Sequence, residues 1–168
     1  MTSESGLHTS QKFASAYAVG TDWRDVARKV LTALETIKTR DHQFQVGFLY
    51  LTEDLVPYTE NIISLFKSVT QIENWVGCSG VGICATDNEF ADESALVAMV
   101  GAFDDDTICY VPNLDPGLVE ARQSCEAWLD QNEAHFSILH GNTCEEPDPE
   151  RILPQIEQET GGYVVGAL

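Results

Sequence analysis

Residues 46–51, with the sequence VGFLYL, form a nearly continuous apolar run of strand length. A run of this kind is typical of a parallel strand that is buried on both faces of its sheet. Stretches with helical periodicity come before it and after it along the chain. This alternation of strand and helix predicts an α/β protein, with a mixed sheet and helices packed on it.

The helix before this run has the clearest helical pattern of the chain. Thr21 or Asp22 is placed to cap its N-terminus. Its apolar residues recur at spacings of three and four, which places them on one face: Trp23, Val26, Ala27, Val30, Leu31, Leu34 and Ile37. In the helix after the run, Pro57 suits the first position. Its apolar face consists of Tyr58, Ile62, Leu65, Phe66 and Val69.

Two further strands complete the first half of the chain. Phe13–Val19 is an expected strand, and Trp75 and Val76 form a short strand that leads into a glycine-rich segment. The polar residues at the start of the chain predict a disordered segment over residues 1–12. One folded domain is then expected over residues 13–168.

The second half begins with a change of pattern. Two apolar runs, 95–103 and 107–111, are joined by three consecutive aspartates at 104–106. This pattern predicts an antiparallel hairpin with the acidic triplet at its turn. Asp115 and Pro116 are expected to cap and begin a helix. The remaining expected elements are a strand over 135–139, a helix over 152–158 and a strand over 163–165.

The order of these elements repeats along the chain. Strand, helix, strand, helix and strand follow one another from Phe13 to Gly77 and again from Thr107 to Gly166, and both copies end in Val-Gly. We therefore expect two duplicated β-α-β-α-β units joined by the β-hairpin. The second copy stops at Leu168, without the glycine-rich segment that follows Gly77, and this predicts a fragment of a longer protein.

The chain carries a large excess of negative charge. Its 168 residues include 9 Lys+Arg and 27 Asp+Glu, a formal net charge of −18, and 43% are hydrophobic. A field of this sign repels phosphate backbones and anionic lipid headgroups, so neither nucleic acid nor a membrane is an expected partner. Solvation of the surface is a sufficient reason for the charge, which by itself identifies no ligand.

Nothing in the sequence indicates export or a membrane span. The longest apolar run, 95–103, is about half as long as a spanning segment requires. Residues 1–10 lack the basic and apolar regions of a secretory signal. The five cysteines form no C-x-x-C pair, so neither a zinc knuckle nor a redox motif is indicated. These features predict a cytoplasmic protein with free thiols.

The most informative local feature is the segment GCSGVG at residues 77–82, directly after an expected strand. Three glycines and a small hydroxyl allow the backbone to turn sharply and to bring N–H groups close to a ligand. The spacing differs from that of a dinucleotide fingerprint, a P-loop and a G-x-S-x-G elbow. A ligand site and a tight turn in which glycine serves packing alone both fit this pattern. The residues expected to contact a ligand are Gly77, Cys78, Ser79 and Gly80.

Cys78 offers a different use of the same segment. A thiol at a strand end becomes a nucleophile when a histidine activates it. His135 and His140 lie at the two ends of an expected strand in the second half, so at most one of them is expected near such a site. An inert buried thiol is the usual role of cysteine in these surroundings. A cysteine-dependent hydrolase or transferase that uses Cys78 is therefore the alternative, and absence of catalysis is the main expectation.

No metal site is predicted. The aspartates at 104–106, with Glu93 nearby, lack the alternating ligands and the distal acid of a calcium loop, so a solvated turn is preferred. The chain's histidines show no metal-ligand spacing: His8, His42, His135 and His140. A group of acidic residues complements the N-terminal dipole of the last helix: Glu145, Glu146, Asp148 and Glu150.

Several short segments together resemble the N-terminal domain of FIST proteins. They are the Ala-Ser-Ala-Tyr strand before Trp23, the run 46–51, Val-Gly-Cys-Ser-Gly at 76–80, the strand at 95–100 and Gly-Tyr-Val-Val-Gly-Ala at 162–167. The resemblance covers residues 13–168 and implies an intracellular sensory domain of bacterial signal transduction, followed by a C-terminal FIST domain. It also implies recognition of a small ligand, with amino acids as the proposed class. Some members of that family are haem-based gas sensors.

These expectations combine into one functional prediction. The chain is expected to be a small-ligand-sensing domain without catalysis or a bound cofactor, whose ligand meets backbone N–H groups around Cys78, Ser79 and Gly80. Its expected partners are the C-terminal FIST domain and a signalling output domain or kinase. The alternatives are the Cys78 enzyme, a haem-based gas sensor and a structural interaction module.

Overall fold

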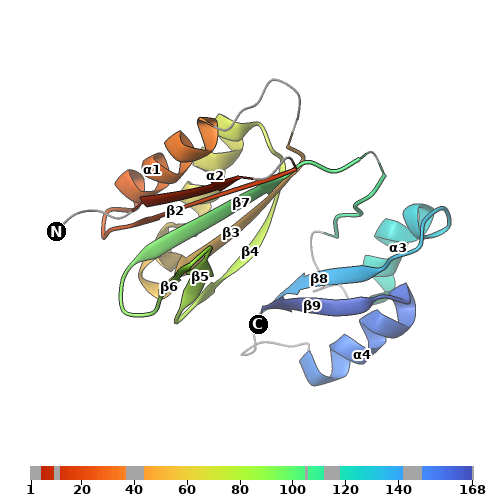
Figure 1. The fold of residues 1–168 in the computed structure, drawn as a ribbon. Coiled ribbons are helices and arrows are strands. Elements are labelled where there is room, and N and C mark those ends of the chain that lie inside the picture. Colours follow the sequence, from red (N-terminus) through yellow and green to blue (C-terminus); the bar gives the residue numbers. More distant parts are fainter. Residues whose placement is uncertain are drawn as a thin grey trace. The chain divides into compact units, whose positions relative to one another are not determined.

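The computed structural model describes residues 5–9, 12–36, 44–104, 106–111, 118–141 and 149–167. The chain divides into two compact units, Met1–Phe103 and Asp104–Leu168. Both units combine strands with helices, and the larger one contains a mixed sheet (Figure 1). The predicted α/β class is therefore confirmed.

The first unit is built on a five-stranded sheet in the order β1-β2-β7-β3-β4 (Figure 1). Strand β3 pairs in parallel with β4, and the other three neighbouring pairs are antiparallel. The strands are β1 (Ser5–Thr9), β2 (Phe13–Val19), β3 (Val46–Thr52), β4 (Asn74–Gly80) and β7 (Ala95–Gly101). The last strand of the unit in sequence thus lies in the middle of its sheet.

Two helices pack on one face of this sheet, and a 3-10 helix precedes the second. They are α1 (Trp23–Glu35), η1 (Glu53–Tyr58) and α2 (Thr59–Thr70). Every second residue of β2 is buried in the same core as these helices, and all three are alanine, which lets α1 approach the sheet closely. Phe66 of α2 is fully buried, and its ring meets Trp75 of β4 edge-on at 5.1 Å. Pro57 lies inside η1, so α2 begins two residues later than expected.

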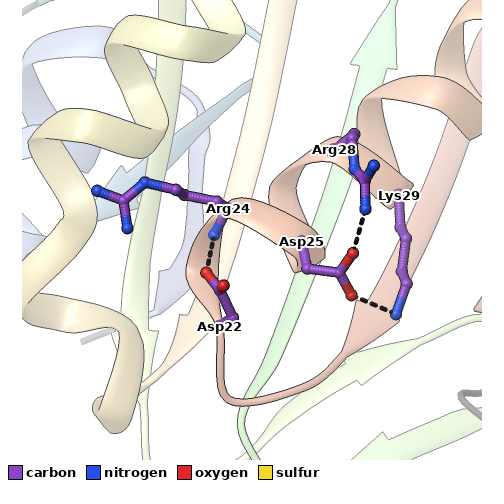
Figure 2. A network of polar contacts seen from close by, with 5 residues as sticks. All are labelled: Asp22, Arg24, Asp25, Arg28 and Lys29. Atoms are coloured by element: carbon purple, nitrogen blue, oxygen red, sulfur yellow. Dashed lines mark hydrogen bonds and ion pairs between the residues drawn. The ribbon is translucent and has the colours of Figure 1, made fainter.

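The start of α1 is held by the polar contacts in Figure 2. The side chain of Asp22 accepts a hydrogen bond from the backbone N–H of Arg24 at 2.9 Å, which confirms Asp22 as the cap. Asp25 forms ion pairs with Arg28 and with Lys29, the latter at 2.6 Å. Hydrogen bonds from Lys29 and Arg28 lower the pKa of Asp25. These contacts join residues at most four positions apart, so the sequence pattern alone could indicate this helix start.

The other face of the sheet carries a small hairpin that the sequence pattern did not predict (Figure 1). Its strands are β5 (Ile83–Ala85) and β6 (Asn88–Phe90). Ile83 and Phe90 are buried together with Ala95 and Val97 of β7. The ring of Tyr17 packs against Phe90, with their centroids 5.1 Å apart. The hairpin thus covers the end of the sheet where β7 begins.

The second unit is smaller and has a parallel strand pair. Its elements are α3 (Leu118–Leu129), β8 (Phe136–His140), α4 (Pro149–Thr160) and β9 (Tyr163–Ala167). Strands β8 and β9 pair in parallel, as the two strands of a β-α-β unit do. Its described buried hydrophobic residues are Ala121, Cys125, Ile152 and Ile156.

The predicted hairpin over residues 95–111 is wrong. Strand β7 ends at Gly101 and pairs with β2 and β3, while residues 107–111 belong to no strand. The chain turns at Asp104 instead, where the backbone N–H of Thr107 donates to the carbonyl oxygen of Asp104 at 3.2 Å. An apolar strand such as β7 needs partners on both edges, and β2 and β3 supply them. Within the described residues, the second copy of the predicted repeat therefore lacks its first strand and begins with its first helix.

Within residues 1–12, where the sequence predicts disorder, the structure describes one short strand. Ser5–Thr9 forms β1 and pairs antiparallel with β2, with Ser5 opposite Ala18. A polar segment can add to a free strand edge because the ladder uses backbone groups rather than side chains. Several expectations fall outside the described residues: those on Ile37, His42, Asp105, Asp115, Pro116, Glu145, Glu146 and Asp148.

Candidate ligand site at the end of strand β4

The four residues predicted to bind a ligand are the last four of β4. They pair in parallel with residues 49–52 of β3, with Gly77 opposite Leu49 and Gly80 opposite Thr52. The glycine-rich turn was therefore predicted too early, because the strand continues through Gly80 and the chain bends at Val81 and Gly82. The segment lies at the carboxyl ends of two parallel strands, where α/β sheets bind ligands. β4 is the last strand in the order of the described sheet, so within the described strands its outer edge has no strand partner.

Gly77 has a structural role. Its backbone has a φ of 156°, and a Cβ added to it would lie 1.7 Å from the carbonyl oxygen of Leu49. No side chain fits at that distance, so only glycine permits this approach of β4 to β3. The close packing of β4 against β3 is therefore a sufficient reason for a glycine at position 77. The segment's capacity for ligand binding rests on Cys78, Ser79 and Gly80.

Cys78 lies beside Tyr50 and is half-buried. Burial raises the pKa of the Cys78 thiol. The pKa of Tyr50 is also raised, first by burial and second by the negative charge of a Cys78 thiolate. A nucleophilic cysteine needs the opposite shift. The surroundings of Cys78 therefore favour a neutral thiol that serves as a small apolar group.

Ser79 and Gly80 supply the accessible polar groups of the segment. Ser79 is exposed, and Gly80 is half-buried. A Cβ added at Gly80 would lie 2.8 Å from the carbonyl oxygen of Gly82, so the bend after β4 is tight. The hydroxyl of Ser79 both donates and accepts hydrogen bonds. Since none of the four predicted residues has a charged side chain, the segment is suited to hydrogen bonding rather than to acid–base chemistry.

Next to this segment lies a polar cluster that the sequence pattern did not indicate. Thr52, opposite Gly80, is buried; its hydroxyl accepts a hydrogen bond from the backbone N–H of Ala95 at 2.8 Å. The buried hydroxyl of Ser94 donates to the carboxylate of Asp54 at 2.8 Å. These contacts connect the end of β3 to the start of β7. The sequence contained one sign of this cluster, because its polar residues lie directly at the ends of two apolar runs.

The histidines and cysteines do not form a second site in the described part of the chain. His135 precedes β8 and His140 ends it, and burial lowers the pKa of His140. No group of three potential metal-ligating side chains occurs among the described residues. Four described cysteines are free: Cys78, Cys84, Cys109 and Cys125.

Within the described residues, no helix has the length and apolar character that crossing a membrane requires. Comparison of the chain with protein-family models, with curated proteins and with solved structures finds no match.

Proposed function

We propose that this chain is a small-ligand-sensing domain of cytoplasmic signal transduction, of the kind found at the N-terminus of FIST proteins. Its ligand binds at the end of β4, and amino acids are the proposed class. A C-terminal FIST domain and a signalling output domain or kinase are the proposed partners. Binding without chemical conversion of the ligand is the proposed activity.

The observation that carries this proposal is the position of Ser79 and Gly80. They end an edge strand at the carboxyl side of a parallel pair, and Ser79 is exposed there. Ligands of open α/β sheets bind outside the carboxyl ends of the strands. The bend at Val81 and Gly82 follows at once, which opens the strand end to a small molecule.

The charge of the chain narrows the class of ligand. With a formal net charge of −18, the surface repels polyanions and favours a zwitterion or a neutral molecule. In the proposed complex, the Ser79 hydroxyl and the backbone N–H groups around Gly80 bind the ligand's carboxylate. Cys78 then contributes an apolar wall, and Gly77 keeps β4 close to β3.

Calorimetric titration of the whole chain with each of the twenty amino acids tests the proposal. We expect at least one to bind, and we expect Ser79→Ala to weaken that binding about fivefold, the equivalent of one hydrogen bond of about 1 kcal/mol. The matched control is Ser68→Ala, because Ser68 is also exposed but lies on α2. Absence of any binder, or equal affinities for the two variants, would contradict the proposal.

The enzyme alternative has its own test. Because burial raises the pKa of Cys78, we expect iodoacetamide at pH 6 to alkylate Cys78 more slowly than Cys84, which is exposed on the β5–β6 hairpin. Peptide mass spectrometry reads both rates in one sample. Faster alkylation of Cys78 than of Cys84 would favour a cysteine-dependent enzyme over a sensor.

A further inference from the structure

Each unit has a Val-Gly dipeptide near the end of a strand, and the two glycines have the same backbone conformation and the same close neighbour. Gly77 of β4 lies opposite Leu49 of β3, and Gly166 of β9 lies opposite Leu139 of β8. The two φ angles are 156° and 155°, and in both places an added Cβ would lie 1.7 Å from the leucine carbonyl oxygen. The β8-α4-β9 arrangement therefore has the same order, direction and close contact as the β3-α2-β4 arrangement.

The two arrangements differ at the other edge of their first strand. Strand β3 is also paired antiparallel with β7, with Leu49 opposite Ala98 and Phe48 opposite Met99. Within the described residues, the sheet that contains β8 has β9 as its only other strand. The second unit therefore shows no counterpart of β7, the strand at the centre of the first sheet.

The same difference explains why residues 107–111 form no strand. They precede the helices of the second unit as β2 precedes those of the first, and Tyr110 takes the place of Tyr17. In the first unit, β2 does not pair with β3, because β7 lies between them. A segment in the position of β2 therefore needs a strand like β7 before it can join a sheet.

The side chains of the two sheets also differ in exposure. Phe136 and Ile138 of β8 are 60% and 45% exposed, and Tyr163 and Val165, opposite them on β9, are 79% and 51% exposed. In the first unit, the counterparts of the two β8 residues are Val46 and Phe48, which are 7% and 5% exposed. Two adjacent apolar pairs on one strand ladder are typical of a surface that binds another polypeptide.

We propose that the second unit binds an extended segment of a partner polypeptide, which adds to β8 as an antiparallel strand in the place that β7 has in the first unit. Main-chain hydrogen bonds to β8 provide the affinity, and side-chain contacts provide the selectivity. By the register of β7, the partner residue opposite Leu139 is small, as Ala98 is opposite Leu49. The expected segment is thus uncharged and apolar, with a small residue at its centre, like ALVAMVG at 95–101.

Charge complementarity adds a second property of the partner. Residues 104–168 carry fourteen acidic and two basic side chains. A segment with Lys or Arg on either side of its apolar middle is attracted by this field, whereas an acidic segment is repelled. The surface therefore selects a cationic partner, rather than another acidic chain such as a second copy of this one.

The test uses the whole chain and a peptide with the sequence of residues 94–102 between two pairs of lysines. Hydrogen exchange followed by mass spectrometry compares the chain with and without the peptide. We expect exchange to slow at least about tenfold in residues 107–111 and 136–140, and to remain unchanged in β3, whose two edges are occupied. In the first unit, the backbone N–H and C=O of Leu49 face β4, so the hydrogen-bonded pair between β3 and β7 is Phe48 with Met99. A peptide with proline at the position of Met99 therefore lacks a backbone N–H that would bond to β8, and it should give no protection.

Two chain variants separate strand addition from loose association. Ile138→Glu places a charge on β8, and we expect it to weaken peptide binding about tenfold, a difference of about 1.4 kcal/mol. The matched control is Val119→Glu on α3, where Val119 is likewise exposed, and it should bind as the unchanged chain does.

Absence of protection, equal protection by the proline peptide, or equal affinity of the two variants would each overturn the proposal. So would stronger binding of a glutamate-flanked peptide. Protection of 136–140 that grows with the chain's own concentration in the absence of peptide would assign the surface to a second copy instead. Amino-acid binding is measured separately at Ser79, so failure of one proposal leaves the other standing.

Discussion

The two units contain the same β-α-β arrangement, yet within the described residues only the first has a second strand beside the arrangement's first strand. In the first unit, β3 lies between β4 and β7, and the core includes fully buried Phe66. In the second, β8 has one neighbour in its described sheet, and Phe136 on it is largely exposed. The same local arrangement is thus buried to very different extents in the two units.

The largest expected effect comes from the two glycines that make the units alike. Gly77→Ala and Gly166→Ala each force a Cβ against a leucine carbonyl oxygen, so each should destabilise its own unit by about 4 kcal/mol or more. Urea unfolding followed by tryptophan fluorescence reports on both units, because Trp75 lies in the first unit and Trp128 lies in the second. The control is Gly161→Ala, where no atom lies within 4 Å of the added Cβ and positive φ alone costs about 1 kcal/mol.

If Gly166→Ala were tolerated while Gly77→Ala unfolded its unit, the two close contacts would not be equivalent. The proposed strand addition at β8 would then lose its structural basis.

Truncation of buried side chains compares how well the hydrophobic cores of the two units are packed. Phe66→Ala should cost about 3–5 kcal/mol, because the ring is fully buried and touches Trp75. Ile156→Ala in α4 should cost about 2 kcal/mol, since Ile156 keeps 8% of its surface exposed and its cavity is open to partial collapse. Val119→Ala, at an exposed position of α3, serves as the control and should change stability by less than about 0.5 kcal/mol. Equal costs at Phe66 and Ile156 would show that the second core is as well packed as the first.

The polar cluster at the end of β3 should have an intermediate effect. Thr52→Val keeps the shape of the side chain but removes the acceptor of the Ala95 N–H, so it should cost about 1–3 kcal/mol. Thr32→Val, at an exposed position of α1, makes the same chemical change without a buried partner. Thermal unfolding followed by circular dichroism distinguishes them, and similar melting temperatures would show that the cluster does not hold β7 to β3.

The smallest expected effect is the pH dependence of the ion pairs at the start of α1. Hydrogen bonds from Lys29 and Arg28 lower the pKa of Asp25 in the folded chain. A lowered folded pKa gives stability that is present above the unfolded pKa of about 4 and is lost as the pH falls through the folded value. Because these side chains are exposed, the gain is small.

Asp25→Asn should therefore reduce the fall in melting temperature between about pH 5 and about pH 2. The matched control is Asp22→Asn, which removes a carboxylate from the same helix start but leaves the ion pairs of Asp25 in place. An unchanged pH profile for Asp25→Asn would show that the pairs contribute no stability.

The elements with local causes could be predicted from the sequence. Strand β2 has the predicted bounds, Phe13–Val19, and α1 begins directly after the predicted cap Asp22. Strand β3 extends one residue beyond the predicted run. A helix satisfies its backbone within its own segment, and an apolar run of strand length has few other uses, so composition and spacing suffice for both.

The elements that depend on segments far away in the chain could not be predicted from the sequence. Strand β1 is polar and exists because β2 offers it an edge, and β7 lies centrally because β2 and β3 each pair with it. Residues 107–111 have the composition of a strand but no partner among the described strands. Local patterns indicate that a segment can be a strand, but they do not indicate which strand lies beside it.

The candidate site, too, has features that the sequence indicates and features that only the folded chain reveals. The sequence pointed to the segment that ends β4, because glycine and serine after an apolar run are visible as a motif. It did not reveal that Gly77 is required by the carbonyl oxygen of Leu49, or that Thr52 and Ser94 join β3 to β7 beside it. Those roles depend on atoms that lie 28 or more positions away in the chain.

Composition and spacing were sufficient to predict the α/β class, the cap and buried face of α1, the strands β2 and β3, and the position of the glycine-rich segment. They also predicted a buried strand over 135–139, which is wrong in its burial, because Phe136 and Ile138 are exposed. The strand order, the bend after Gly80 rather than Gly77, the burial of Cys78 and the exposed pairs on β8 and β9 become visible only in the folded structure. The physical reason is that side-chain spacing acts over one turn of helix or one strand, whereas strand pairing and burial depend on segments that meet only in the folded chain.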